Sequence, residues 1–390
     1  MQTDLNKLVE SITFHTLSMF WPGFSVHAFA IYDEHDAYLF HHPLHKKNGT
    51  HIKRDNQFNG CTVILLEGYP TAIVDVRLYP NEKNLMAILV HELFHIHQHV
   101  SGESRAPNEM LGMTYPLSIK NIDLRTRERV ELDKALKAKD TALIERHCKN
   151  FIELRLTRMN DIEEHVRYEN LVETIEGPAW YVESKALRYW NSSETTTFSS
   201  PLTNARVATQ EIRRSCYHSG MAICKILDKL NPDWKKDHFQ SAKTLFDQLM
   251  DCFAGTSFNT GREEPITQQS EELFVLTQQL IMGEFNAFEL QQGIHVYISG
   301  EVTIKEFDPM NVISLGQERL YKTFINVSLN GKECSIYQPV LVELHKSKKK
   351  VNVLHLVVEN ARQTNENEYE LKGIGVMKGH FKKRGLFIYV

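Results

Sequence analysis

The residues of this chain whose types and spacing best suit chemistry lie in the segment 85–100. There His91, Glu92 and His95 form an H-E-x-x-H pattern. On a helix, positions i and i+4 lie one turn apart on the same face, so these two imidazoles could bind one zinc ion. Glu92 would lie beside them and could accept a proton from water that the metal activates. The same spacing also arises by chance among structural histidines, so the motif needs support from the remaining chain.

The sequence around the motif favours a buried helix. Asn81 can cap its start, and Gly102 follows its end. His99 lies four residues after His95 and is an alternative ligand, and His97 adds to the local enrichment in histidine. Apolar residues occupy nearly every side of the expected helix: Leu85, Met86, Ile88, Leu89, Val90, Leu93, Phe94 and Ile96.

The composition is typical of a soluble globular protein and argues against several classes. The chain has 390 residues, 42% of them apolar and 24% charged, which is enough for two or three domains. The net charge of −4 implies no general attraction to nucleic acid, and no apolar run is long enough to span a membrane. Six scattered cysteines without a C-x-x-C pair, and an N-terminus unlike a secretion signal, predict a cytoplasmic protein. The oligomeric state stays open.

The periodicity along the chain predicts an α+β fold with two domains. Residues 1–284 should form a mainly helical domain with a small N-terminal sheet, whose strands fall within 27–44 and 61–80. A charged helical hairpin is expected at about 121–160. Residues 285–390 alternate in polarity and should form an all-β domain, a small barrel or sandwich. Within it, Asn330-Gly331 predicts a two-residue hairpin turn.

A second set of candidate residues lies on a helix expected at 167–190. Glu169, Glu173, Glu176 and Glu183 recur at spacings of four, three and seven, which places them on one helix face. Four carboxylates on one face repel one another unless cations neutralise them. Either arginines and lysines or a metal site could do so, and the pattern leaves both open.

A third expected helix, at 205–230, carries Tyr217 and His218. Gly220 lies within it, where glycine costs about 1 kcal/mol relative to alanine. A glycine at such a position indicates close packing against another element.

Together, these three segments resemble the gluzincin metallopeptidases, especially aminopeptidase N and the glycyl aminopeptidases. In that group the third zinc ligand is a glutamate in an N-E-G-F-A-x-Y-like segment. The present chain departs from it at Ile175 and Pro178, which replace Asn and Phe. The positions that match are Glu176, Gly177, Ala179 and Tyr181.

A later family segment, Y-x-K-G-[AF], carries a tyrosine that acts in the transition state. Here Tyr217 and Gly220 match, and Ser219 replaces the lysine. The 81 positions between His95 and Glu176 exceed the gap in close aminopeptidase relatives, and the hairpin at 121–160 accounts for the excess as an insertion. The G-x-M-E-N segment that binds a free amine in aminopeptidase N is absent, so the resemblance does not imply exopeptidase activity.

The resemblance implies a thermolysin-like domain with a zinc ion held by His91, His95 and Glu176. Glu92 would act as general base in the hydrolysis of a peptide or protein substrate. Tyr217, or alternatively His218, would donate a hydrogen bond to the developing oxyanion.

Other residues could support this site. Glu169 and Glu173 are candidates for orienting the histidine rings, and the strand at 71–78 could offer an edge to an extended peptide. Two other functions remain open: a non-catalytic protein that binds a peptide or partner, and a zinc hydrolase acting on a non-peptide bond.

Overall fold

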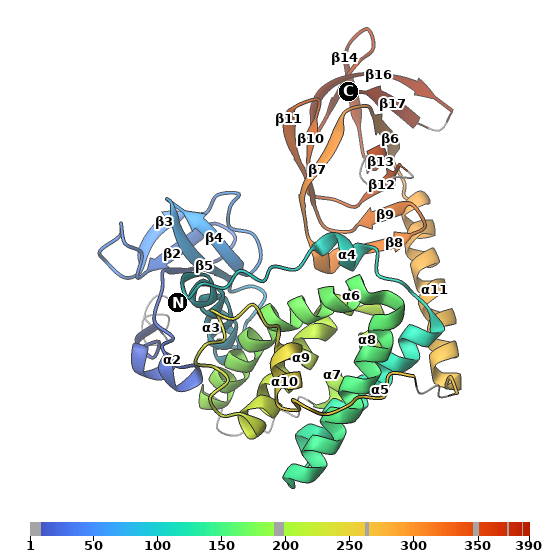
Figure 1. Cartoon of the computed structure of the whole chain (residues 1–390). Helices are drawn as coiled ribbons and strands as arrows, with labels where there is room; N and C mark the ends of the chain where they lie inside the picture. Colours follow the sequence, from blue (N-terminus) through green and yellow to red (C-terminus); the bar gives the residue numbers. More distant parts are fainter. Residues whose placement is uncertain (1–8, 191–198, 262–264, 346–350, 373, 384) are drawn as a thin grey trace. The chain divides into compact units, whose positions relative to one another are not determined.

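Helices and sheets combine in two units of this chain. The structure, a computed structural model, describes residues 9–190, 199–261, 265–345, 351–372, 374–383 and 385–390 (Figure 1). The first unit comprises residues 1–107, 124–208 and 214–263, and the second comprises residues 108–123, 209–213 and 264–390. The expected α+β class is confirmed: an N-terminal sheet, a central helical region and a mostly-β C-terminal region.

The N-terminal sheet of the first unit contains five strands: β1 (Phe29–Tyr32), β2 (Asp36–Phe40), β3 (Thr50–Lys53), β4 (Thr62–Leu66) and β5 (Tyr69–Asp75). Their order is β3-β2-β1-β5-β4, and only β1 and β5 run parallel. The prediction that the strand at 71–78 offers a free edge is therefore wrong. This strand is β5, which pairs with β1 on one side and β4 on the other, so β4 forms this edge of the sheet. The period-2 patterns at 27–44 and 61–80 did predict four of the five strands.

The H-E-x-x-H motif lies on α3 (Glu82–Val100), which packs against β5 and a later helix. Asn81 caps α3 as expected, because its Oδ1 accepts hydrogen bonds from the backbone N–H groups of Lys83 (2.9 Å) and Asn84 (3.2 Å). Most apolar residues of α3 are buried in the main hydrophobic core, Ile88 is partly buried, and only Val100 at the end of the helix is exposed. Burial on nearly all sides fixes the helix, and with it the motif, between the sheet and the helical region.

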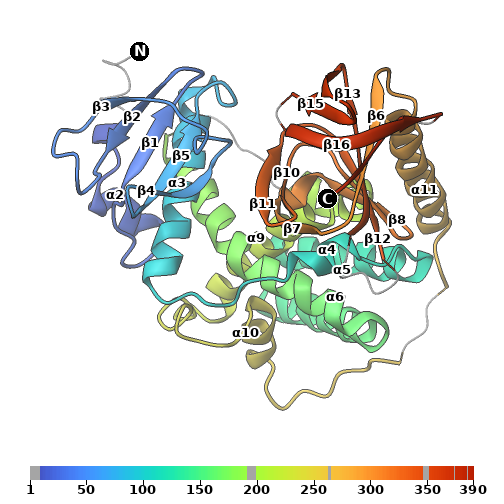
Figure 2. The ribbon, with the colours of Figure 1, turned by 90° about the horizontal axis from the view of Figure 1, so that it is seen from above.

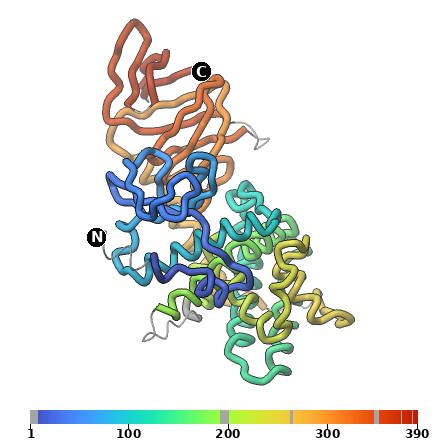
Figure 3. The backbone as a smooth tube through the Cα atoms, turned by 90° about the vertical axis from the view of Figure 1, so that its left-hand side faces the viewer, coloured from blue at the N-terminus to red at the C-terminus, as the bar shows by residue number. Residues whose placement is uncertain are grey.

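The other helices of this region are α2 (Phe14–Phe20), α5 (Ile119–Lys137), α6 (Thr141–Trp190), α7 (Ser199–Thr203), α8 (Ala205–Gln210), α9 (Ile212–Leu230) and α10 (Leu245–Asp251). The expected hairpin is formed by α5 and the first part of α6, which can be followed in the tube trace (Figure 3). Ile162 has non-helical backbone angles (φ −139°, ψ 47°), so α6 consists of two helical parts that meet at a bend. The second part carries the candidate glutamates.

Two glycines let α6 and α9 cross with their backbones in contact. A Cβ atom at Gly177 would lie 2.6 Å from the backbone of Gly220, and one at Gly220 would lie 2.5 Å from the carbonyl oxygen of Glu173. No larger residue fits at either position without moving a helix. The close packing expected from Gly220 is confirmed, and it brings Tyr217 on α9 close to the helix that carries Glu176.

The described residues of the second unit form twelve strands: β6 (Ile294–Ser299), β7 (Val302–Phe307), β8 (Val312–Leu315), β9 (Glu318–Tyr321), β10 (Ile325–Leu329), β11 (Lys332–Ile336), β12 (Val340–Leu344), β13 (Val351–Val358), β14 (Ala361–Asn365), β15 (Glu368–Leu371), β16 (Gly375–Lys382) and β17 (Gly385–Tyr389). Nine form one sheet in the order β14-β15-β16-β17-β6-β13-β12-β9-β8, and β11-β10-β7 form another. Figure 2 shows these strands around a common centre, which an apolar core fills.

Local sequence signals explain several features of the second unit. Asn330 and Gly331 have positive φ values of 48° and 78° between β10 and β11, as the expected two-residue hairpin requires. The helices α4 (Glu109–Met113) and α11 (Gln268–Glu289) also belong to this unit, with a short 3₁₀ turn, η1 (Pro309–Asn311). Phe285 and Phe288 of α11 pack on Leu320 and Leu341 of the large sheet.

Candidate metal centre

The first unit brings His91 and His95 of α3 together with Glu176 of α6. The two Nε2 atoms lie 3.0 Å apart, and Glu176 Oε2 lies 3.6 Å from His91 Nε2 and 3.4 Å from His95 Nε2. A tetrahedral zinc ion with bonds near 2.0–2.1 Å needs ligand atoms about 3.3 Å apart. These three atoms therefore have the spacing of a possible zinc site.

Hydrogen bonds on the outer side of each ring fix which nitrogen faces the site. Gln98 Nε2 donates to the carbonyl of Ile175 (2.8 Å), which leaves Gln98 Oε1 to accept from His95 Nδ1 (2.8 Å). Glu183 Oε2 accepts from His91 Nδ1 (2.9 Å). Both histidines in their neutral form thus present an Nε2 lone pair to the site. Two lone pairs at 3.0 Å repel each other, and a cation bound between them turns this repulsion into ligation.

The site has a negative potential. Burial lowers the pKa of His91, but Glu176 and Glu183 together outweigh burial and raise that pKa to about 10. His91 and Glu176 are only 4% and 7% exposed, so water screens this potential weakly. Glu176 and Glu183, which attract a proton to the His91 ring, also favour a divalent cation between the three ligand atoms.

Glu92 lies on α3 directly after His91 and is 7% exposed. Burial raises the pKa of the Glu92 carboxyl group, and the nearby negative charge of Glu176 raises it further. The charges of His91 and His95 lower this pKa but do not cancel the rise. A carboxylate with a raised pKa binds a proton more readily than one in water. Glu92 therefore has the environment that a proton-transferring group needs.

Tyr217 and His218 lie on α9 on the side of His91. The ring of Tyr217 stacks beside that of His91, with centroids 6.4 Å apart and planes at 19°. Trp180 contacts both residues edge-on, with centroids 5.7 Å from Tyr217 and 4.5 Å from His218. Burial is the main cause that lowers the pKa of His218 to about 4, so its ring is neutral at pH 7. Tyr217 is half-buried, and its ring lies beside a ligand of the triad.

Glu169 and Glu173 belong to a buried charge network and not to the histidine pair. Glu169 Oε2 accepts from Arg125 Nε (2.8 Å), and Glu173 Oε1 accepts from Ser219 Oγ (2.5 Å). The expected ring-orienting role falls instead to Glu183 and Gln98, because arginines neutralise the two earlier carboxylates of the helix face. The members of this network share near-complete burial: Arg125, Glu128, Arg155, Arg158, Glu169, Glu173 and Ser219.

The neighbouring histidines of α3 lie away from the triad. His97 packs among the rings of Phe24, Phe94 and Phe239, and burial lowers its pKa to about 4. His99 is exposed. Neither joins Glu176, so the structure favours His91 and His95 as the pair on α3 that could hold a metal.

Comparison with known proteins gives no relative to place beside this site. The searches found no matching family model, no similar curated protein and no similar solved structure. Among the described residues, no helix is long and apolar enough to cross a membrane. The assignment of a function therefore rests on the geometry of this chain.

Glu183 and Gln98, which orient the triad, have no role that the sequence patterns predict. Glu183 follows Glu176 by seven positions, or two turns of the same helix face, and this spacing was the available signal. Gln98 follows His95 by three positions, which places it one turn along α3. Periodicity put both near the ligands, but only the packing of α3 on α6 shows which atoms they contact.

Proposed function

We propose that the chain is a zinc-dependent hydrolase that cleaves peptide bonds, with a site of the gluzincin kind. The observation that carries the proposal is the triad of His91, His95 and Glu176, whose ligand atoms lie 3.0–3.6 Å apart, with the Nε2 atom of each imidazole turned inward. Two imidazoles and one carboxylate are the protein ligands of several catalytic zinc sites, which keep a fourth position open for water or substrate.

Zinc, when bound, would supply a Lewis acid that polarises a scissile carbonyl and lowers the pKa of a water molecule. The chain's own residues perform the other steps. Glu92 accepts the proton of the attacking water and later passes it to the leaving amine. Tyr217 donates a hydrogen bond to the carbonyl oxygen as negative charge develops there. His218, neutral and packed on Trp180, is the alternative donor.

The general-base role predicts a selective loss in the Glu92→Gln variant. The amide cannot accept the proton, so we expect peptide hydrolysis to fall by about 10²–10⁴-fold. Zinc content should stay equal to that of the unmodified chain, because Gln keeps the shape and Glu92 is not a ligand. Cleavage of a peptide library, with zinc measured in the same samples, tests both statements.

The matched control is Glu103→Gln, which removes a buried carboxylate paired with Arg105 elsewhere in the first unit. This control should keep its catalytic activity per folded molecule. Full activity of Glu92→Gln would remove Glu92 from the mechanism. A zinc-containing chain that binds peptides of the library without cleaving any would instead favour a binding protein.

A further inference from the structure

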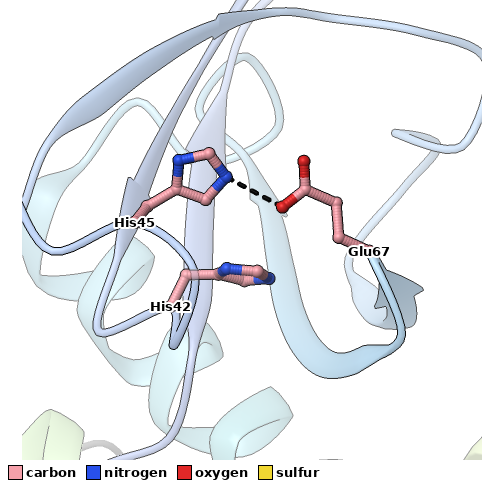
Figure 4. Close-up of side chains that lie close together, drawn as sticks. All are labelled: His42, His45 and Glu67. Atoms are coloured by element: carbon pink, nitrogen blue, oxygen red, sulfur yellow. Dashed lines mark hydrogen bonds and ion pairs between the residues drawn. The ribbon is translucent and has the colours of Figure 1, made fainter.

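A second cluster of metal-ligand side chains lies on the N-terminal sheet. His42 and His45 occupy the loop between β2 and β3, and Glu67 lies in the two-residue turn between β4 and β5 (Figure 4). His45 Nε2 and Glu67 Oε2 are 2.9 Å apart. One ligand atom of each residue lies within 4.8 Å of the others. Side chains from two separate loops therefore converge on one point.

One ring nitrogen of His42 has no hydrogen-bond partner in the part of the chain that the structure describes. The residue is 2% exposed, and its Nε2 lies 3.1 Å from the carbonyl oxygen of Leu66. A carbonyl can only accept, so Nε2 carries the hydrogen and Nδ1 presents a lone pair. This Nδ1 is buried and has no hydrogen-bond partner among the described residues. Leaving a buried polar atom unpaired destabilises the fold, and a bound cation would offset this cost.

Turn geometry does not explain why glutamate occupies position 67. Glu67 has a positive φ of 49° and Gly68 one of 84°, and they join two antiparallel strands. Such a hairpin turn favours Asn, Asp or Gly at its first central position, and glutamate there adds backbone strain. The carboxylate at this position nevertheless faces His45, as the close-up shows (Figure 4).

The donor set indicates the class of ion. Two imidazoles and a carboxylate suit Zn²⁺ and similar transition metals, whereas Ca²⁺ and Mg²⁺ prefer oxygen ligands alone. The side chains of His45 and Glu67 are 24% and 49% exposed. The ligand atoms lie within 4.8 Å of one another, and rotation of these two side chains can bring all three to the roughly 3.3 Å spacing that tetrahedral zinc requires.

We propose that His42, His45 and Glu67 form a second zinc-class site, independent of the triad on α3 and α6. The ion would connect the β2–β3 loop to the β4–β5 hairpin. In the sheet, β1 and β5 lie between β2 and β4. An ion bound by these residues would thus link the β2–β3 loop to the β4–β5 turn across the β1–β5 pair. Its expected role is to stabilise the sheet, including the edge strand β4, by an amount that grows with the logarithm of the free zinc concentration once this exceeds the dissociation constant.

Zinc stoichiometry of the full chain in a metal buffer tests the proposal. We expect about two zinc ions per unmodified chain and about one in either His45→Ala or Glu67→Gln, because each variant removes one of three ligands. Both side chains are partly exposed, so neither change should prevent folding. The matched control is His51→Ala, which removes an exposed histidine of β3 that pairs with Asp36. This control should keep about two ions.

A second variant separates this proposal from the proposed function. His95→Ala should lose the ion of the α3–α6 triad and keep the other, and adding His45→Ala should remove both. In the His95→Ala chain, zinc should raise the thermal midpoint, and His45→Ala should abolish that rise. Equal zinc content of His45→Ala, Glu67→Gln and the unmodified chain would overturn the second site. Loss of zinc in these variants with none lost in His95→Ala would overturn the triad instead.

Discussion

At the scale of single residues, the candidate metal centre depends on oxygen atoms outside its triad. Glu183 Oε2 and Gln98 Oε1 each accept a hydrogen from an imidazole Nδ1, which turns both Nε2 lone pairs toward Glu176. Without these partners either ring could bind its proton at Nε2 and cease to be a ligand. The affinity of this candidate site for a metal would therefore depend on residues outside the triad.

The Glu183→Gln variant tests this dependence. A neutral amide accepts a weaker hydrogen bond than a carboxylate and can present its N–H₂ group to His91 instead. We expect the dissociation constant for zinc to rise by about 10–100-fold, as measured by competition with a chelator.

The control for this variant is Glu163→Gln, which changes an exposed glutamate on the same helix paired with Arg167. It should leave zinc affinity unchanged. The same affinity in Glu183→Gln and the unmodified chain would mean that Glu183 does not set the state of His91.

At the scale of elements, the site depends on how closely α6 and α9 approach. Gly177 and Gly220 put the two backbones in contact, and the buried arginine–glutamate network joins α5, both parts of α6, and α9 through Ser219. Three arginines and three glutamates balance in charge, and their hydrogen bonds are made inside the unit, where breaking one pair is costly. Helix packing thus fixes how closely α9, which carries Tyr217, approaches α6, which carries Glu176.

The Gly220→Ala variant should destabilise the fold although alanine favours helices. Its Cβ would lie 2.5 Å from the Glu173 carbonyl oxygen and 2.8 Å from Gly177 Cα, so α6 and α9 must separate. We expect a loss of about 1–3 kcal/mol in the free energy of unfolding, measured with urea.

Gly283→Ala on α11 is the matched control, because Gly283 is also helical but a Cβ there meets no atom within 4 Å. This substitution should stabilise the chain by up to about 1 kcal/mol. Equal effects of the two substitutions would show that the helix crossing tolerates a methyl group.

At the scale of the molecule, stability should depend on pH through histidines that fold in their neutral form. His238 is fully buried beside Trp21, Trp234 and Phe239, and burial lowers its pKa to about 3. In the unfolded chain a histidine binds its proton near pH 6.5. Between about pH 6.5 and 3 the unfolded state therefore binds more protons, and the free energy of unfolding falls as pH falls.

In the His238→Phe variant, the free energy of unfolding should fall less steeply as the pH is lowered across this range. Phenylalanine cannot bind a proton, so unfolding of the variant takes up one proton fewer. Urea unfolding at several pH values measures the slope, and the loss of the contact with Gln248 lowers stability equally at each pH. His99→Ala, which removes an exposed histidine of the same unit, should leave the slope unchanged. Identical slopes for His238→Phe and the unmodified chain would contradict this prediction.

The sequence by itself determined what depends on local spacing. The H-E-x-x-H helix, its Asn81 cap, the Asn330-Gly331 turn and the close approach at Gly220 follow from backbone periodicity and from the steric limits of single residue types. The choice of Glu176 came from a resemblance, and the structure then placed its carboxylate beside both histidines.

Only the tertiary structure decided which side chains from distant segments meet. On one helix face, arginines bind Glu169 and Glu173, while Glu176 and Glu183 contact the histidines. The position of β4 at the sheet edge depends on strand order, and a period-2 pattern carries no information about order. Such contacts are fixed by the packing of segments that lie tens of residues apart, which the spacing within any one segment cannot specify.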